Sequence, residues 1–261
     1  MMWRVGLTIL LWSVVVFPAA AAPVYLDTFE QFTVGTDLTN ITYTPAIGGI
    51  NSALLHPHFG TPTSPHVTAV NAFGSIAAEF NLPIGSGEDY LGSFQTTYTN
   101  VPLVFDWDFE ALGSNDGLGG FFIRFPTPDL DMQVLMGFLD DGRVIVFSGQ
   151  PSPETIEEIG TYLAGVNYHA SLALDLASDT YSVWLDGSPL LLGQPIPAHI
   201  NNTSIHQFGF DSTEHMGSSE GNVFLLDNVS VAVGAQVPEP ATLTLLGMGL
   251  AGLAARARRR R

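Results

Sequence analysis

Between residues 22 and 236 the sequence alternates apolar and polar residues, and turn-forming residues recur about every ten positions. Helical periodicity is nearly absent, and only Glu154 to Gly160 is expected to form a short helix or turn. The chain has no cysteine, which excludes disulfides, thiol catalysis and cysteine-based zinc sites. The sequence therefore predicts one all-β domain, a two-sheet antiparallel β-sandwich stabilised by burial alone.

The clearest pattern lies between Tyr168 and Leu192. Ser171 to Asp175 and Thr180 to Leu185 read as neighbouring strands, and Tyr181, Val183 and Leu185 share one face of the second. The pair at 186–187 is an Asp-Gly hairpin signal, as is the pair at 141–142. Further strands are expected at 101–110, 120–125, 135–139, 143–147, 190–192, 205–211 and 223–233.

Tyr168-His169, Leu174-Asp175 and the run from Tyr181 to Gly187 resemble the laminin-G and concanavalin-like jelly roll. The resemblance implies two antiparallel sheets of about six or seven strands each, one of them concave. It also implies that His169 packs or forms hydrogen bonds within the fold. It does not fix a function, because this fold hosts lectins, glycosidases and adhesion modules.

Residues 1–21 have the regions of a secretory signal peptide. Arg4 supplies the positive charge, Val5 to Phe17 is almost unbroken apolar sequence, and Ala19 and Ala21 permit cleavage before Ala22. A buried helix or a membrane anchor is the alternative, but the run is short for a span and ends in small residues. The sequence thus predicts export.

Residues 237–261 contain Pro238-Glu239-Pro240, an apolar stretch from Ala241 to Ala255 and a terminal arginine cluster. This order resembles the PEP-CTERM sorting signal of Gram-negative bacteria. The resemblance implies an exosortase partner, an intermediate anchored in the inner membrane by a short transmembrane helix, and transfer to the cell surface or release in bacteria that make exopolysaccharide. The arginines should stay cytoplasmic. The alternative is a plain C-terminal membrane anchor.

The predicted domain is strongly acidic. The chain has no lysine, and the 24 acidic residues outside the tail face only Arg124 and Arg143, which leaves a net charge near −22. Such a surface repels nucleic acid and anionic lipid, so a nucleic-acid partner is not expected. It attracts calcium, which prefers oxygen ligands. A solubility role or a saline habitat explains the charge equally well.

Acidic residues stand near both ends of the domain, with Asp27 and Glu30 at the start and Asp227 near the end. In jelly-roll carbohydrate-binding modules the first and last strands pair and hold a structural calcium ion with such residues. The resemblance implies that Asp27, Glu30 and Asp227 supply three carboxylates to Ca²⁺. The alternative is that they are exposed loop acids.

The run from Phe105 to Glu110 alternates aromatic and acidic residues. Asp106, Asp108 and Glu110 fall on one strand face, with the aromatic residues on the other. Three such carboxylates resemble the catalytic strand of retaining β-glucanases, whose outer pair act as nucleophile and acid/base. The first position here is Asp rather than Glu, and the aromatics do not share the acidic face, which favours a solvated face over an aromatic core.

Other catalytic motifs are missing from the sequence. The histidines His56, His58, His66, His199, His206 and His215 have no zinc-site spacing. There is no Gly-x-Ser-x-Gly elbow and no phosphate-binding loop. Three functions remain: a non-catalytic surface or matrix protein associated with glycan, a purely structural coat component, and a secreted glycosidase or lyase that uses the acidic strand.

Overall fold

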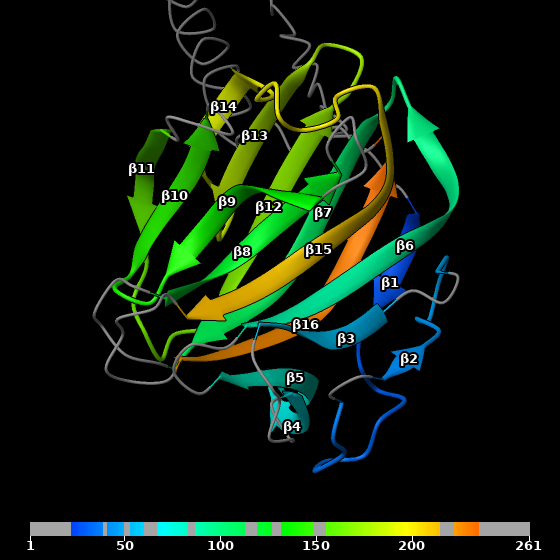
Figure 1. Ribbon diagram of the computed structural model, residues 1–261, viewed down its shortest axis with the longest axis vertical. Coiled ribbons are helices and arrows are strands. Elements are labelled where there is room, and N and C mark those ends of the chain that lie inside the picture. The colour runs from blue at the N-terminus through cyan, green and yellow to red at the C-terminus, as the bar shows by residue number, and fades with distance from the viewer. Residues whose placement is uncertain are drawn as a thin grey trace, which may run out of the picture.

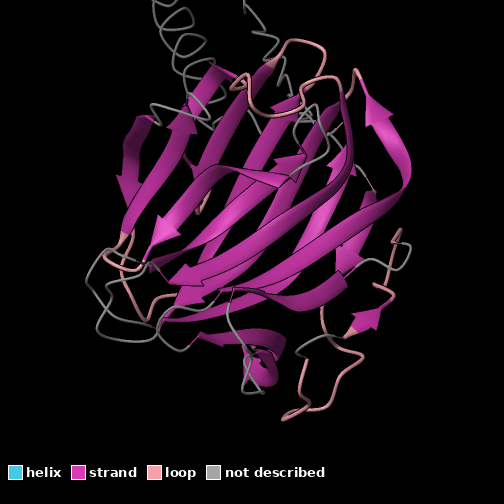
Figure 2. Cartoon of the chain, in the orientation of Figure 1, coloured by secondary structure: helices cyan, strands magenta, loops and turns pink. Residues whose placement is uncertain are grey.

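The computed structural model describes residues 22–38, 41–49, 53–59, 67–82, 87–112, 119–126, 132–148, 155–214 and 222–234. In this part of the chain all regular structure is β-strand, and two antiparallel sheets lie face to face (Figures 1 and 2). The predicted all-β sandwich is confirmed. The predicted signal peptide and sorting tail lie outside the described residues.

Sheet I forms the rear layer in Figure 1 and has eight strands. Their spatial order is β14 (Ser188–Pro195), β13 (Thr180–Leu185), β12 (Tyr168–Asp175), β7 (Pro102–Ala111), β16 (Asn222–Val233), β5 (Ser75–Leu82) and β4 (Val67–Ala72), with β1 (Pro23–Asp27) also paired to β16.

Sheet II forms the front layer and also has eight strands. Their order is β11 (Thr155–Thr161), β10 (Arg143–Ser148), β9 (Met132–Leu139), β8 (Gly119–Pro126), β15 (Ser204–Glu214), β6 (Gly87–Thr99), β3 (Ala53–Phe59) and β2 (Thr42–Tyr43). Each sheet is thus slightly larger than the six or seven strands that the jelly-roll resemblance implied.

The prediction of a helix or turn at 154–160 is wrong. Thr155 to Thr161 form β11, which pairs with β10 at the edge of sheet II. No residue of this strand is buried, so it has no apolar face to produce a period of two. Backbone pairing with β10, rather than side-chain burial, makes this segment a strand.

The last strand, β16, joins the rest of sheet I together. It pairs with β7 on one side, while on the other Asn222–Leu226 pair with β5 and Val229–Ala232 pair with β1. A bulge separates the two halves, and Asn228 adopts a positive φ of 52° there. The first and last strands are therefore paired, as the jelly-roll resemblance implied.

Aromatic side chains fill the space between the sheets. Their rings pack largely edge to face, for example Phe105 and Phe208 with centroids 5.3 Å apart. The fully buried aromatic residues include Trp107, Tyr25, Tyr90, Phe29, Phe80, Phe105, Phe109, Phe121, Phe125, Phe138, Phe208, Phe210 and Phe224.

Both predicted Asp-Gly hairpins are confirmed. Asp186 and Gly187 have φ values of 48° and 71°, the two positive angles that a tight two-residue hairpin needs. At the β9–β10 turn Gly142 has a φ of 88°, and its N–H donates to the carbonyl of Leu139 at 2.9 Å. These turns fix the register of the strands on either side.

Gly92 of β6 allows a close approach that a larger residue would block. A Cβ at this position would lie 2.4 Å from Cζ of Phe208, whose ring is held by Tyr25, Phe94 and Phe105. We expect Gly92→Ala to destabilise the domain by about 1–3 kcal/mol through overpacking, measured as a lower urea midpoint.

Gly160→Ala is the matched control, because a Cβ there meets only the end of the Leu190 side chain, at 3.0 Å. Leu190 is only partly buried and its side chain can turn away. Equal midpoints for the two variants would contradict the proposed steric role of Gly92.

Candidate functional site

The acidic face of β7 points away from the sandwich interior. Trp107 and Phe109 are fully buried between the sheets, while the side chains of Asp106 and Asp108 lie on the outer face of sheet I and remain 31% and 28% exposed. Glu110 follows on the same face at a partly buried position. The alternation predicted for this strand is therefore present.

His169 of β12 lies between the first two of these acids. It stands directly opposite Asp108 in the β7–β12 pairing, and Ser171 stands opposite Asp106. Nδ1 of His169 is 2.8 Å from Oδ1 of Asp108, and Nε2 is 3.6 Å from Oδ1 of Asp106. The Ser171 hydroxyl donates to Asp106. The carboxylates of Asp106 and Asp108 raise the pKa of His169 to about 10, so the imidazole is cationic at neutral pH.

The second oxygen of Asp108 faces β16. The side-chain amide of Asn228 donates to Oδ2 of Asp108 at 2.8 Å, and the Asn228 N–H donates to Oδ1 of Asp227 at 2.7 Å. Partial burial alone would raise the pKa of Asp108, but hydrogen bonds from His169 and Asn228 outweigh it and hold the pKa below its usual value.

Asp227 has a different electrostatic environment. It is fully buried, and the hydroxyl of Ser75, at the start of β5, donates to its Oδ2. Burial, with the nearby charges of Asp108 and Glu30, raises the pKa of Asp227 to about 6.

These residues form one outer polar strip across strands β12, β7, β16 and β5. We define the strip as Ser171, Asp106, His169, Asp108, Asn228, Asp227 and Ser75. Its carboxylates already accept hydrogen bonds from neighbours, and Asp108 is ionised at neutral pH. A glycosidase acid needs a raised pKa, so Asp108 is suited to holding His169 rather than to donating a proton.

Sequence reasoning identified only part of this strip. It predicted that His169 packs or forms hydrogen bonds, which is confirmed, but it did not link His169 to Asp106 and Asp108. It gave neither Ser171 nor Asn228 a part in a site. The cross-strand register brings them together, and a single sequence does not contain that register.

The three acids of the predicted calcium site are placed differently. Asp27 faces the interior, whereas Asp227 lies on the outer face of sheet I, opposite Asp108. Glu30 is near Asp227 and accepts a hydrogen bond from the Ile76 N–H at 3.0 Å. Among the described residues no group of three His, Cys, Asp or Glu side chains is arranged to hold a metal ion. The calcium assignment stays a prediction.

Asp27 is surrounded by tyrosine hydroxyls. Its Oδ2 accepts hydrogen bonds from Tyr43 at 2.6 Å and Tyr90 at 3.0 Å, and its Oδ1 accepts one from the Phe29 N–H at 3.2 Å. Burial raises the pKa of Asp27 despite these donors, and burial together with the Asp27 charge raises the pKa of both tyrosines well above 10. The contacts fasten β1 to the opposite sheet.

Among the described residues, the remaining histidines do not form part of a metal-binding group. The side chains of His56 and His58 on β3, together with His66 and His215, lie outside the described set. His199 contacts the Val134 carbonyl through Nε2 at 3.1 Å. His206 lies on β15 at a partly buried position.

The sorting tail, including Pro238, Glu239 and Pro240, also lies outside the described residues. Within the described part of the chain, no helix is long and apolar enough to cross a membrane.

The C-terminal tail matches a known family model. Residues 236–260 match the family model for the PEP-CTERM protein-sorting motif. The chain carries a PEP-CTERM sorting motif. Such a motif implies an exported protein that an exosortase sorts, in agreement with the resemblance carried by Pro238-Glu239-Pro240. No curated protein matches the sequence.

Solved structures establish the fold of the domain. A sialidase matches with a TM-score of 0.52 and a sequence identity of 18%. The match covers 82% of this chain but only 18% of the length of the sialidase. Alginate lyase A1-II′, a member of polysaccharide lyase family 7, matches with a TM-score of 0.51 and 10% identity over 67% of this chain and 86% of the lyase. At such low identity these similarities show the fold alone, a concanavalin-like jelly roll.

The outer polar strip predicts a specific pH dependence. Because the pKa of His169 is raised from 6.5 to about 10 on folding, its contribution to stability is complete below pH ~6.5 and is lost as the pH rises through about 10. The urea midpoints of the native protein and the His169→Gln variant should differ most below pH ~6.5 and converge toward pH ~10.

The same assignment is testable by NMR. The His169 imidazole should titrate near pH 10, and Asp108→Asn should lower that pKa because one carboxylate is removed. A His169 resonance that titrates near pH ~6.5 in the native protein would contradict the ionised strip.

Proposed function

We propose that this protein, once exported and sorted by an exosortase, works at the cell surface or in the extracellular matrix as a non-catalytic, glycan-associated or structural β-sandwich. The observation that carries the proposal is the PEP-CTERM motif at 236–260, which follows directly on a sandwich whose last strand ends at Val233. The predicted signal peptide would start export, the motif would direct sorting, and the sandwich is the domain that is delivered.

The outer polar strip supports a non-catalytic role. Asp106 and Asp108 hold His169 and Ser171 in place, and Asp108 is ionised at neutral pH. A carboxylate used in this way is not available as a general acid. The aromatic residues of β7, which would stack on a sugar in a glucanase, are buried on the opposite face.

The charge distribution supports a neutral rather than an acidic glycan. Both arginines of the domain are ion-paired, Arg124 with Asp211 at 3.6 Å and Arg143 with Asp141 at 2.6 Å. An acidic polysaccharide would be repelled unless cations bridged it to the surface. A divalent cation such as calcium, bound by exposed carboxylates of the acidic surface, would serve such bridging.

The test is fractionation of a bacterium that has an exosortase and makes exopolysaccharide. The native protein should appear in the surface or matrix fraction, shortened at both termini and sedimenting with exopolysaccharide. Glu239→Ala should leave the C-terminus intact and the protein in the inner membrane, because the sorting motif is altered. Recovery of the native chain in the cytosol with both termini intact would overturn the proposal.

A secreted glycoside hydrolase or lyase is the second candidate. Asp106, Asp108 and Glu110 share one face of β7, and Trp184 lies opposite Ser171 on that same face. If the protein cleaves β-glucan or alginate, Glu110→Ala should reduce the rate by about 100-fold or more, measured as release of reducing ends. Glu158→Ala, at the edge of sheet II, is the control. No cleavage by the native protein would remove this candidate.

A further inference from the structure

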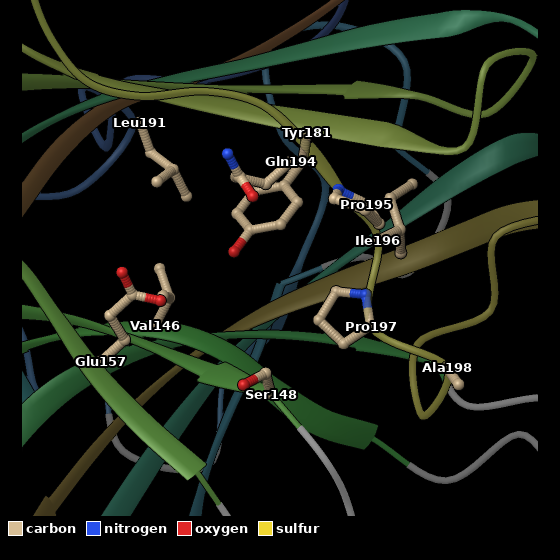
Figure 3. A pocket seen from close by; sticks show the side chains of 10 residues that line it. All are labelled: Val146, Ser148, Glu157, Tyr181, Leu191, Gln194, Pro195, Ile196, Pro197 and Ala198. Atoms are coloured by element: carbon tan, nitrogen blue, oxygen red, sulfur yellow. The ribbon is translucent and has the colours of Figure 1, made fainter.

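A cavity opens at one side of the sandwich, where the edge strands of the two sheets meet. It has a volume of about 400 Å³ and is lined from above by β13 and β14 of sheet I and from below by β10 and β11 of sheet II (Figure 3). The lining residues are Val146, Ser148, Glu157, Tyr181, Leu191, Gln194, Pro195, Ile196, Pro197 and Ala198. This volume lies in the lower part of the range of roughly 300–1,000 Å³ typical of small-molecule sites.

Four polar side chains converge on this cavity. Tyr181 and Gln194 point into it from sheet I, and Glu157 and Ser148 point into it from sheet II (Figure 3). Among the described residues, none of the four has a hydrogen-bond partner for its side chain. Burial and the charge of Glu157 raise the pKa of Tyr181 to about 12, so its hydroxyl keeps its proton and can donate to a ligand.

Rigid apolar surfaces form the rest of the wall. Pro195 and Pro197 have fixed backbone angles, and the segment between them is held by the Ile196 N–H, which donates to the Asp179 carbonyl at 3.0 Å. The flat ring of Tyr181 suits the C–H face of a sugar ring, while hydroxyl, amide and carboxylate groups suit its hydroxyls. A wall already fixed in this way loses little entropy on binding.

The ligand should not be an anion. Glu157 and the acidic surface disfavour a carboxylate, and no cationic side chain lines the cavity. We propose that the cavity between the sheet edges binds one neutral pyranose unit of a glycan, with Glu157 and Tyr181 as its principal hydrogen-bonding residues. This inference rests on the proposed glycan association and gives it a location away from the outer polar strip.

The test is a titration of the full-length chain with simple sugars, in which binding is measured by calorimetry or saturation-transfer NMR. The probes are the methyl glycosides of glucose, galactose and mannose, with methyl glucuronide and glucosamine for comparison. At least one neutral glycoside should bind saturably, and glucuronide should bind at least about tenfold more weakly. Glu157→Gln should weaken binding about tenfold or more because a charge-assisted hydrogen bond is lost, and Tyr181→Phe about threefold or more.

Glu158→Gln is the matched control. Glu158 neighbours Glu157 on β11 but pairs with Ile145, whose side chain lies on the outer face of sheet II, whereas Glu157 pairs with Val146 of the interior. This variant should bind sugar like the native protein, and urea midpoints should show that all three variants fold. Unchanged affinity in both Glu157→Gln and Tyr181→Phe, saturable binding of no neutral glycoside, or tightest binding of glucosamine would each overturn the assignment.

Failure of this inference differs from failure of the proposed function. If the native protein sediments with exopolysaccharide but binds no neutral glycoside, the cavity assignment falls and the proposed function stands. If neutral glycosides bind at the cavity but the exported protein does not associate with exopolysaccharide, the glycan-associated role falls while the cavity remains a sugar site.

Discussion

The pairing of β16 with three other strands holds sheet I together. Without β16, the block from β14 to β7, the β4–β5 hairpin and β1 would have no common neighbour in this sheet. The contact between β1 and β16 joins the two ends of the domain, and loop closure over such a separation makes folding slow. The sandwich therefore completes only when its last strand is available. Because the PEP-CTERM motif begins shortly after that strand, the exported chain must present its sorting signal close to the final element of its fold.

The bulge in β16 connects this architecture to the outer polar strip. It lets one strand pair first with β5 and then with β1, and it places the Asn228 amide against Asp108 and its N–H against Asp227. The strip contains one of the few cations of the domain, His169, and that cation is shared between Asp106 and Asp108. With Arg124 and Arg143 also ion-paired, the positive charges are neutralised locally and the surface field stays negative.

The sequence predicted elements whose signals are local. Alternation identified β7, β12 and β13, and the Asp-Gly pairs identified two turns, because each signal depends on burial or on backbone angles within a few residues. β11 was mistaken for a helix or turn because it has no buried face. The contact between His169 and Asp108 depends on the β7–β12 register, and the separation of Asp27 from Asp227 depends on which sheet face each residue occupies. Neither property is local, so neither could be predicted from one sequence.

The location of the cavity follows from the same topology. β14 and β11 are edge strands of different sheets on one side of the sandwich, and no strand of the described chain spans the gap between them. Open edges invite pairing with other chains, and Pro195, Glu157 and Glu158 are residue types that oppose such pairing. A charged residue such as Glu157 therefore both opposes edge-to-edge pairing and suits the proposed sugar site. Glu157 discourages a neighbouring strand from pairing with this edge, and in the proposed sugar site the same carboxylate accepts a hydrogen bond from the ligand.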